Sequence, residues 1–397
     1  MRRLALTLIS MTSLSATAAD WTQFRGANGS AVSSEKNLPT GFNESTGLRW
    51  KAELPGRGVS SPVISGNRVY ITCSTGQKDD QLHVLAFDLA TGKQLWHRQL
   101  LGTGDTHCHP DTCMAAPTPV ADKSGVYALF ATGDLAAFDP DGNLRWYRSL
   151  VGDYPTVSNQ VGMAASPVLA KGKLLLPMDN VGDSFIAAID TTTGKNLWKT
   201  SRPRDISWTT PLTRTVGDKV EIIYPGARET VAYDVDSGSK VWSVKTGGGS
   251  IPSPTIVDDL FILGAGGVAV YRLGADGPKE LWQSPKFRTG HSSPLVYDGR
   301  IYAANPAGIV VCADAKTGKV IWQERVGKKP FAASPVAGDG KIYLFGEDGI
   351  LTAIKAGDSL EILGEYPTKE RGQATPAIAD GAIFVRGEKT LFCVGAK

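Results

Sequence analysis

The feature that most constrains the fold is a unit of about forty residues that repeats along the chain. Eight prolines each follow a small residue, and the last five are 40 to 43 residues apart. Four short strands with their turns have this length, which is one blade of a β-propeller. The prolines are Pro62, Pro119, Pro167, Pro211, Pro254, Pro294, Pro335 and Pro376. A Trp recurs with them at Trp50, Trp96, Trp146, Trp198, Trp242, Trp282 and Trp322, and Ile362 is assigned to the eighth position.

The pattern inside one unit predicts four antiparallel strands. Residues 292–322 read SSPLVYDGRIYAANPAGIVVCADAKTGKVIW. Pro294 precedes the first strand, a position where the N–H group that proline lacks is not required for strand pairing. A DG pair and a TG pair supply residues that tolerate positive φ, so each marks a turn. A four-stranded sheet cannot bury both of its faces alone, so we expect the units to stack around an axis with the Trp as filler between neighbours.

The ends of the chain predict how the ring closes. Eight prolines start blades, but the unit that begins at Pro376 stops after its third strand. Residues 48–51 precede the first proline and can supply the missing outer strand, which leaves no free sheet edge at the junction. The prediction is therefore an all-β fold: one domain, residues 20–397, forming an eight-bladed β-propeller closed by its N- and C-terminal strands.

The first nineteen residues have the pattern of an export signal. Arg2 and Arg3 precede an apolar run to Leu14, and small residues follow up to Ala19. We expect a signal peptide at residues 1–19, a periplasmic or secreted protein, no membrane span and a monomer. The net charge of +3 comes from 42 basic and 39 acidic side chains spread along the chain, which argues against nucleic acid as a partner.

Three segments resemble a known repeat. They are AFDLATGKQLW (residues 86–96), AIDTTTGKNLW (188–198) and AYDVDSGSKVW (232–242), and they are similar to the AxDxxTGxxxW repeat of the PQQ-type propellers. That group contains quinoprotein alcohol dehydrogenases and the propeller lipoprotein of the outer-membrane barrel assembly machinery. The opening WTQFRGANGS, residues 21–30, resembles the start of exported PQQ-repeat proteins. The resemblance implies the propeller fold, but a fold hosts many activities.

Two departures from the dehydrogenases argue against a bound cofactor. The resemblance implies PQQ stacked between a Trp and a ring of adjacent cysteines, with Ca²⁺ held by carboxylate and amide ligands. This chain has no adjacent cysteines and no recognisable acidic cluster at matching positions. Trp208 either takes the place of the stacking Trp or is an aromatic residue at the channel mouth, and we favour the second. We therefore expect no cofactor and no catalytic residues.

One loop concentrates residues that bind metals or oxidise. His107, Cys108, His109, Asp111 and Cys113 lie within seven residues. Two imidazoles, two thiols and a carboxylate could bind Zn²⁺ or copper. Alternate residues of a short loop rarely converge on one metal, and disulfides persist in an oxidising compartment. The sequence favours a local Cys108–Cys113 disulfide over a metal site.

Connection lengths predict where a partner binds. From each Trp to the next proline the chain uses 12 or 13 residues, but it uses 23 after Trp96 and 21 after Trp146. Residues 75–81 and 178–184 are also extended, and all these loops open on one face of a propeller. Long loops on a rigid scaffold are common functional sites. The candidate ligand or partner surface comprises His107, His109, Asp111, Asp153, Tyr154, Asn159, Trp208 and His291.

Three functions remain open at this point. The preferred one is a non-catalytic binding or scaffold protein of the bacterial cell envelope, with an envelope protein or a small ligand as its partner. The second is an oxidoreductase that uses PQQ and Ca²⁺. The third is a binder of small anions at the channel mouth, drawn by the cations Arg57, Arg204, Arg288, Lys328, Lys329 and Arg371.

Overall fold

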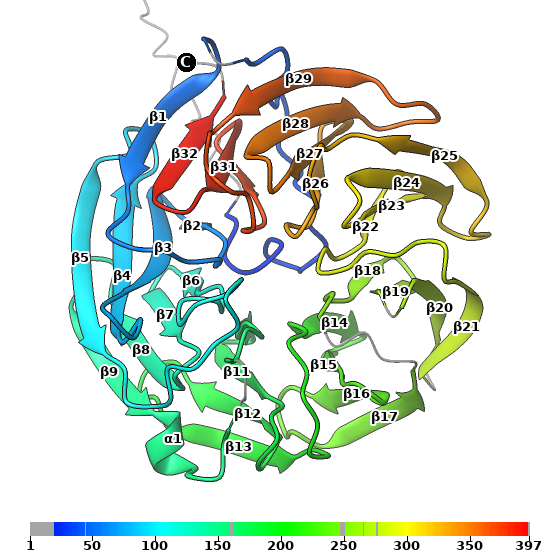
Figure 1. Cartoon of the computed structure of the whole chain (residues 1–397). Helices are drawn as coiled ribbons and strands as arrows, with labels where there is room; N and C mark the ends of the chain where they lie inside the picture. Colours follow the sequence, from blue (N-terminus) through cyan, green and yellow to red (C-terminus); the bar gives the residue numbers. More distant parts are fainter. Residues whose placement is uncertain are drawn as a thin grey trace, which may run out of the picture.

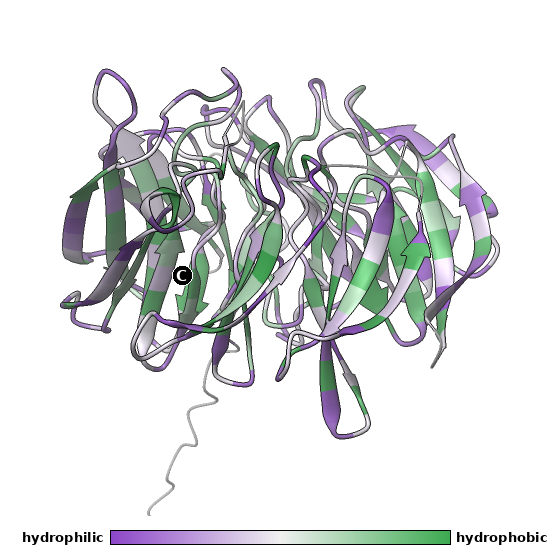
Figure 2. Cartoon of the chain, turned by 90° about the horizontal axis from the view of Figure 1, so that it is seen from below, coloured by the Kyte–Doolittle hydropathy of each residue, from purple (hydrophilic) through white to green (hydrophobic). Residues whose placement is uncertain are grey.

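The chain forms a ring of eight antiparallel sheets, each with four strands, around a central channel (Figure 1). The computed structural model describes residues 20–43, 45–158, 162–246, 251–264, 266–274 and 277–395. The predicted eight-bladed propeller is confirmed. The predicted signal peptide lies outside the described residues. Seen edge-on, the ring is a flat disc whose strands carry bands of hydrophobic residues (Figure 2).

Each blade begins at the channel with a short strand that follows one of the eight prolines. These innermost strands are β2 (Val63–Ser65), β6 (Val120–Asp122), β10 (Val168–Ala170), β14 (Leu212–Val216), β18 (Thr255–Val257), β22 (Leu295–Tyr297), β26 (Val336–Gly338) and β30 (Ala377–Ala379). The second strands are β3 (Arg68–Thr75), β7 (Gly125–Leu129), β11 (Lys173–Met178), β15 (Lys219–Pro225), β19 (Leu260–Gly264), β23 (Arg300–Ala304), β27 (Lys341–Phe345) and β31 (Ala382–Arg386).

The outer half of each blade is a second antiparallel pair, which is a hairpin in every blade except the eighth. Its third strands are β4 (Gln81–Asp88), β8 (Asp134–Phe138), β12 (Phe185–Asp190), β16 (Glu229–Asp234), β20 (Val268–Gly274), β24 (Ile309–Asp314), β28 (Ile350–Lys355) and β32 (Thr390–Val394). The outermost strands are β5 (Gln94–Leu101), β9 (Leu144–Ser149), β13 (Asn196–Ser201), β17 (Lys240–Lys245), β21 (Gly277–Ser284), β25 (Val320–Arg325), β29 (Ile362–Pro367) and β1 (Leu48–Glu53).

The repeated Trp joins neighbouring blades, as the sequence predicts. Trp96 in β5 donates its indole N–H to the Pro140 carbonyl of the next blade at 2.8 Å. The turn glycine of that blade, Gly142, has positive φ, and a Cβ there would lie 2.7 Å from the Trp96 ring. Glycine is therefore required both by the backbone and by the close approach of the ring. The outer hairpin of every blade has a register irregularity next to this position.

The eighth blade contains both ends of the propeller. Strand β1 pairs antiparallel with β32, and Trp50 lies opposite Cys393. The sheet order β1-β32-β31-β30 gives this blade the same form as the other seven. Trp50 donates to the Leu89 carbonyl of the first blade at 3.0 Å. The predicted closure by the N- and C-terminal strands is confirmed.

The assignment of Ile362 to the eighth Trp position is wrong. In the other blades Trp lies opposite an Ala, Cys or Val of the third strand, and in the seventh blade the equivalent residue, Ala353, lies opposite Gly364. Ile362 pairs with Ile354 and is 48% exposed. A Cβ on Gly364 would lie about 3.0 Å from the backbone of Gly41 and Phe42. The N-terminal segment occupies the space that a Trp fills elsewhere, and Phe42 is buried there.

The segment that precedes β1, residues 20–43, crosses the channel before it reaches the seventh blade. We call it the N-terminal arm (Figure 1). It pairs at Trp21 with Ile64 of the first blade and at Val32 with Ala337 of the seventh. Its other contacts include a bond from the Ala121 amide to the Thr22 carbonyl. The arm therefore closes the channel at the end opposite the loops that follow the outermost strands.

Helix is almost absent from the described residues. The one helix there, α1 (Leu150–Asp153), has four residues and follows β9. Within the described part of the chain, no helix is long and apolar enough to cross a membrane.

Candidate functional site at the channel mouth

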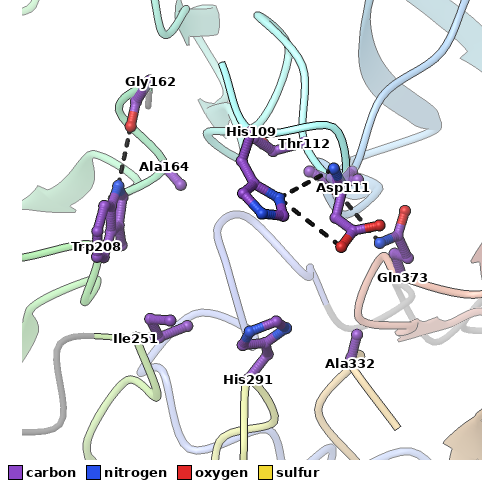
Figure 3. A pocket seen from close by; sticks show the side chains of 11 residues that line it. His109, Asp111, Thr112, Gly162, Ala164, Trp208, Ile251, His291, Ala332 and Gln373 are labelled. Carbon is purple, nitrogen blue, oxygen red and sulfur yellow. Dashed lines mark hydrogen bonds and ion pairs between the residues drawn. The ribbon is translucent and has the colours of Figure 1, made fainter. Parts of the chain in front are cut away.

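The loops that lead into the innermost strands surround a cavity of about 380 Å³ at the open end of the channel. Seven blades contribute the residue three positions before their proline, so the repeat itself builds the wall. Most of the apolar and aromatic wall residues lie together on one side, and most of the polar ones lie on the other (Figure 3). The lining residues are Val59, His109, Asp111, Thr112, Gly162, Ala164, Trp208, Ile251, His291, Ala332 and Gln373.

The long connection after β5 folds inward over this cavity. We call residues 102–116 the mouth insertion. Asp111 at its tip bonds to Arg371 of the eighth blade at 2.8 Å, and the Gln373 amide donates to the Asp111 carbonyl at 3.2 Å. Arg57 donates to the Pro110 carbonyl at 3.2 Å. These contacts join the mouth insertion, which connects the first two blades, to the connections that lead into the first and the eighth blade.

Interactions with neighbouring cations favour the ionised form of Asp111 at the tip of the mouth insertion. The hydrogen bond from Arg371 lowers the pKa of the Asp111 carboxyl below its ordinary value, and His109 and His291 add smaller effects in the same direction. The His109 Nδ1 atom lies 3.7 Å from the Asp111 carboxylate and accepts from the Asp111 amide at 3.2 Å. Arg371 also bonds to Glu347 at 2.7 Å. The mouth therefore holds one compact network of charged groups on this side.

The opposite side of the mouth is aromatic and apolar. Trp208 donates its indole N–H to the Gly162 carbonyl at 2.9 Å, which fixes the ring at the cavity wall (Figure 3). Ile251 and Ala332 flank His291 on the neighbouring blades. Trp208 thus lies at the channel mouth, a position that is compatible with both interpretations of this residue.

Below the mouth the channel narrows to a neck of about 120 Å³. Phe24 of the N-terminal arm is among the residues that line it. In each blade the residue before the proline is Ser or Thr, and all eight are at least 93% buried. Backbone amides donate to the hydroxyl oxygen of the next blade at 2.9–3.0 Å in seven of the eight steps. We call this ring the hydroxyl belt: Ser61, Thr118, Ser166, Thr210, Ser253, Ser293, Ser334 and Thr375.

The structure separates the residues that the sequence analysis grouped together. His109, Asp111, Trp208 and His291 line the mouth cavity. His107 is exposed on the mouth insertion and is not among the lining residues. Asn159 lies outside the described residues.

The expectation that Asp153 and Tyr154 lie near the channel mouth is wrong. Both belong to the segment around α1, which lies at the outer rim of the ring (Figure 1). Asp153 bonds to Arg148 of β9 at 2.7 Å. The Tyr154 ring packs against Phe185 with centroids 4.8 Å apart, and its hydroxyl accepts from Asn196 at 2.6 Å. These contacts draw the second insertion outward onto the third blade rather than inward.

The predicted Cys108–Cys113 disulfide is not present in the structure, where both residues are free thiols. The Cys108 thiol faces the Thr112 carbonyl at 3.8 Å, and Cys113 is buried in the core between the first two blades. Burial raises the pKa of the Cys108 thiol, which makes it less reactive as a thiolate. The disulfide of the exported protein stays a prediction. Among the described residues, no three His, Cys, Asp or Glu side chains are placed to hold a metal ion.

The six cations considered for anion binding do not converge. None of them lines the mouth cavity or the neck. Arg204 bonds to Asp183 at 2.8 Å, Arg371 is held by Asp111 and Glu347, and Arg57 donates to carbonyls of the mouth insertion. Three of the six side chains thus have partners within the loops.

The hydroxyl belt and the channel-closing arm were missed by the sequence analysis. The belt has a clear signal, because Ser or Thr precedes every blade proline. That position had been noted only as small. The wall residues three positions before each proline follow from the same register. The path of the arm has no comparable signal, since residues 20–43 lack the repeat.

Comparisons with known proteins agree with this architecture. A family model described as outer membrane protein assembly factor BamB matches residues 19–177, 182–284 and 267–390. A polyvinylalcohol dehydrogenase of Sphingopyxis sp. (strain 113P3) is 23% identical over 345 residues, which are 70% of this chain and 46% of that protein. BamB of Alkalilimnicola ehrlichii (strain ATCC BAA-1101 / DSM 17681 / MLHE-1) is 28% identical over 225 residues, 56% of this chain and 50% of the relative. The chain thus spans about half the length of these curated relatives.

Solved structures show the same fold at low sequence identity. The quinohemoprotein alcohol dehydrogenase from Comamonas testosteroni superposes with a TM-score of 0.73 and 16% identity over 96% of this chain and 81% of that chain. BamB from Moraxella catarrhalis gives a TM-score of 0.63 and 16% identity over 88% and 97%. The family model covers nearly the whole described chain, and the ring has the eight blades that its repeats predict. The chain therefore belongs to the PQQ-repeat propeller family that the BamB model describes.

Proposed function

We propose that this chain is an exported, monomeric, non-catalytic binding protein of the bacterial cell envelope, whose partner docks at the channel mouth. One observation carries the proposal: the channel is closed at one end and opens at the other into a cavity partly covered by the mouth insertion. Five of the other connections from Trp to proline need only 12 or 13 residues, so joining blades does not require the additional length. Extra loops held in place on a rigid scaffold are suited to recognition.

The chemistry of the mouth suits a protein or peptide partner. Trp208 provides a rigid aromatic surface, and aromatic residues often contribute most to binding energy at interfaces. His109, Asp111 and Gln373 provide donors and acceptors on the other side of the cavity (Figure 3). Membership in a family named for an outer membrane assembly factor supports an envelope partner.

The first test is site-specific photo-crosslinking in cells. A photoreactive residue replaces Thr112 at the mouth, and the matched control replaces Lys123, which is exposed in the turn between β6 and β7 at the opposite face. The proposal expects discrete adducts from position 112 and none from position 123. Equal adducts from both positions, or none from position 112, would contradict docking at the mouth.

A second variant separates folding from binding. Replacing residues 105–111 with a shorter glycine linker leaves every sheet, every inter-blade Trp and the buried residues Cys113, Met114 and Ala115 in place. The shortened protein should therefore unfold at nearly the same denaturant concentration as the intact protein, while a photoreactive residue at Gln373 loses its adducts. Retained adducts in the folded, shortened protein would move the partner surface elsewhere.

The alternative is a PQQ- and Ca²⁺-dependent oxidoreductase, which the similarity to polyvinylalcohol dehydrogenase supports. The described residues fit this cofactor poorly. Trp208 offers a stacking face at the mouth, but no group of three His, Cys, Asp or Glu side chains in the described residues is placed to hold the calcium ion. Stoichiometric binding of added PQQ and Ca²⁺ with alcohol oxidation would favour the oxidoreductase over the binding protein.

A further inference from the structure

The hydroxyl belt presents donors to the neck of the channel. Seven of its members line the neck, and each accepts a hydrogen bond from a backbone amide through its oxygen. Among the described residues, no acceptor bonds to their hydroxyl hydrogens. A hydroxyl that already accepts a hydrogen bond is a stronger donor, because bonds in a chain polarise one another. The neck thus holds seven buried donors that need acceptors.

A buried cation lies directly beside the belt. The side chain of Arg25, in the N-terminal arm, is among the largest fully buried groups of the protein. Its guanidinium donates to the carbonyls of Pro254 and Pro294 at 2.8 Å, and these residues directly follow belt residues. It also donates to the Thr255 hydroxyl at 2.7 Å. No carboxylate forms an ion pair with it in the described part of the chain.

Burying the charge of Arg25 costs free energy, and no carboxylate among the described residues pairs with it to offset that cost. Burial lowers the pKa of Arg25 to about 9, so the group still carries its charge at neutral pH. Burying a charge without a partner is unfavourable, and a neutral side chain of similar size is often tolerated better. A cation that has hydrogen bonds but no carboxylate partner among the described residues therefore gives the neck beside it a positive potential.

The other walls of the channel do not cancel this potential. No acidic side chain lines the neck within the described residues. Above the neck, the wall residues Val59, Ala164, Ile251 and Ala332 are apolar, and Trp208 adds an aromatic face. Asp111 is held at the rim by Arg371. The mouth thus offers an apolar and aromatic wall on the side of Trp208 and Ile251, polar groups on the side of Asp111, and hydroxyl donors in the neck below.

We propose that the neck of the channel is a binding site for a small oxyanion, typically a carboxylate carried on an apolar or aromatic stem. The stem lies against Trp208 and Ile251 in the mouth, and the carboxylate oxygens accept from belt hydroxyls such as Ser253 and Ser293. Hydrogen bonds to an ionised acceptor are about twice as strong as those between neutral groups. This site deepens the proposed function and rests on it: the docking partner supplies the carboxylate.

The test uses benzoate as the probe and benzamide, its neutral counterpart of the same shape, as the control. Calorimetry or NMR titration of the full exported chain should show saturable binding of benzoate and binding of benzamide weaker by at least about tenfold. Equal binding of the two probes, or no saturable binding of benzoate, would overturn the proposal.

A substitution that adds a negative charge at the rim of the neck tests whether the carboxylate binds there. Ala332 lines both the mouth and the neck and is partly exposed, so larger side chains can be accommodated there. Ala332→Glu places a negative charge beside the carboxylate and should weaken benzoate binding by about tenfold or more. Ala332→Gln, of nearly the same shape, should weaken it by no more than about threefold. Equal losses in the two variants would overturn the electrostatic assignment.

Competition between benzoate and the partner tests the oxyanion site separately from the proposed docking function. Benzoate at saturating concentration should abolish the photo-adducts from position 112. Adducts that persist beside bound benzoate would retain the oxyanion site but overturn the claim that the partner supplies the carboxylate. Benzoate binding without any adducts at all would retain the site and contradict the docking function.

Discussion

The two ends of the central channel are built in different ways. At the closed end the N-terminal arm pairs its backbone with two blades and buries Trp21, Leu38 and Phe42 in a hydrophobic core cluster. At the open end the tip of the mouth insertion is held by side-chain contacts of Asp111, which is 48% exposed. Burial of apolar area contributes far more to stability than exposed ion pairs do. Changes at the closed end should therefore cost stability, and changes at the mouth should cost recognition.

The largest expected effect comes from the same substitution made at both ends. Trp21 is 2% exposed and its backbone exchanges two hydrogen bonds with Ile64 at 2.8 and 2.9 Å. Trp21→Ala should lower the free energy of unfolding by about 4 kcal/mol, the usual range for a buried aromatic. Trp208→Ala at the mouth should lower it by less than about 1 kcal/mol. Urea unfolding monitored by circular dichroism measures both, and similar losses would remove the contrast between the ends.

A second, smaller effect tests whether the arm replaces the missing Trp of the seventh blade. Phe42 is 3% exposed beside Gly364, whereas Ile362, at the position first assigned to this role, is 48% exposed. Phe42→Ala should therefore cost about 3 kcal/mol of unfolding free energy. Ile362→Ala should cost about 0.5 kcal/mol or less. The reverse order in urea unfolding would restore the sequence-based assignment.

The smallest effect concerns the contact that holds the mouth insertion. Asp111→Asn removes an exposed ion pair with Arg371 and should change the unfolding free energy by only a few tenths of a kcal/mol. Because Arg371 lowers the pKa of Asp111 in the folded protein, this contribution is complete above the ordinary aspartate pKa of about 4 and disappears as the pH falls below it. The wild-type protein and the variant should therefore converge in stability at acidic pH, as urea titrations at several pH values can show. A larger difference, or one that persists in acid, would indicate that the insertion is packed rather than only tethered.

Most of the fold could be predicted because the same proline and Trp positions recur in nearly every blade. Pro62 and its equivalents mark the innermost strands, and the recurrent Trp marks the outermost. The seventh blade was misassigned because Gly364 has no side chain to signal the position. The space is filled by Phe42, which is more than 300 residues away in sequence. A local pattern contains no information on such a distant contact.

The candidate site was predicted less completely. The mouth insertion and Trp208 were identified from connection length and position. The length of a connection does not show whether the loop folds inward over the channel or outward over the blades. Tyr154 was therefore expected at the mouth, although its contacts with Phe185 and Asn196 hold it at the outer rim. The donors of the neck come from eight equivalent residues in separate units, and their convergence appears only when the ring is closed.

The use of the N-terminal strand β1 in the eighth blade has a consequence for how the protein reaches its native state. Strand β1 is made more than 300 residues before its partner β32. Contacts between such distant segments form late, because the loop-closure entropy must be lost before any pairing compensates for it. During synthesis β1 stays unpaired until β32 has been made, which exposes it to aggregation. Completion of the ring is thus coupled to synthesis of β32, so a chain truncated before β32 cannot close its eighth blade.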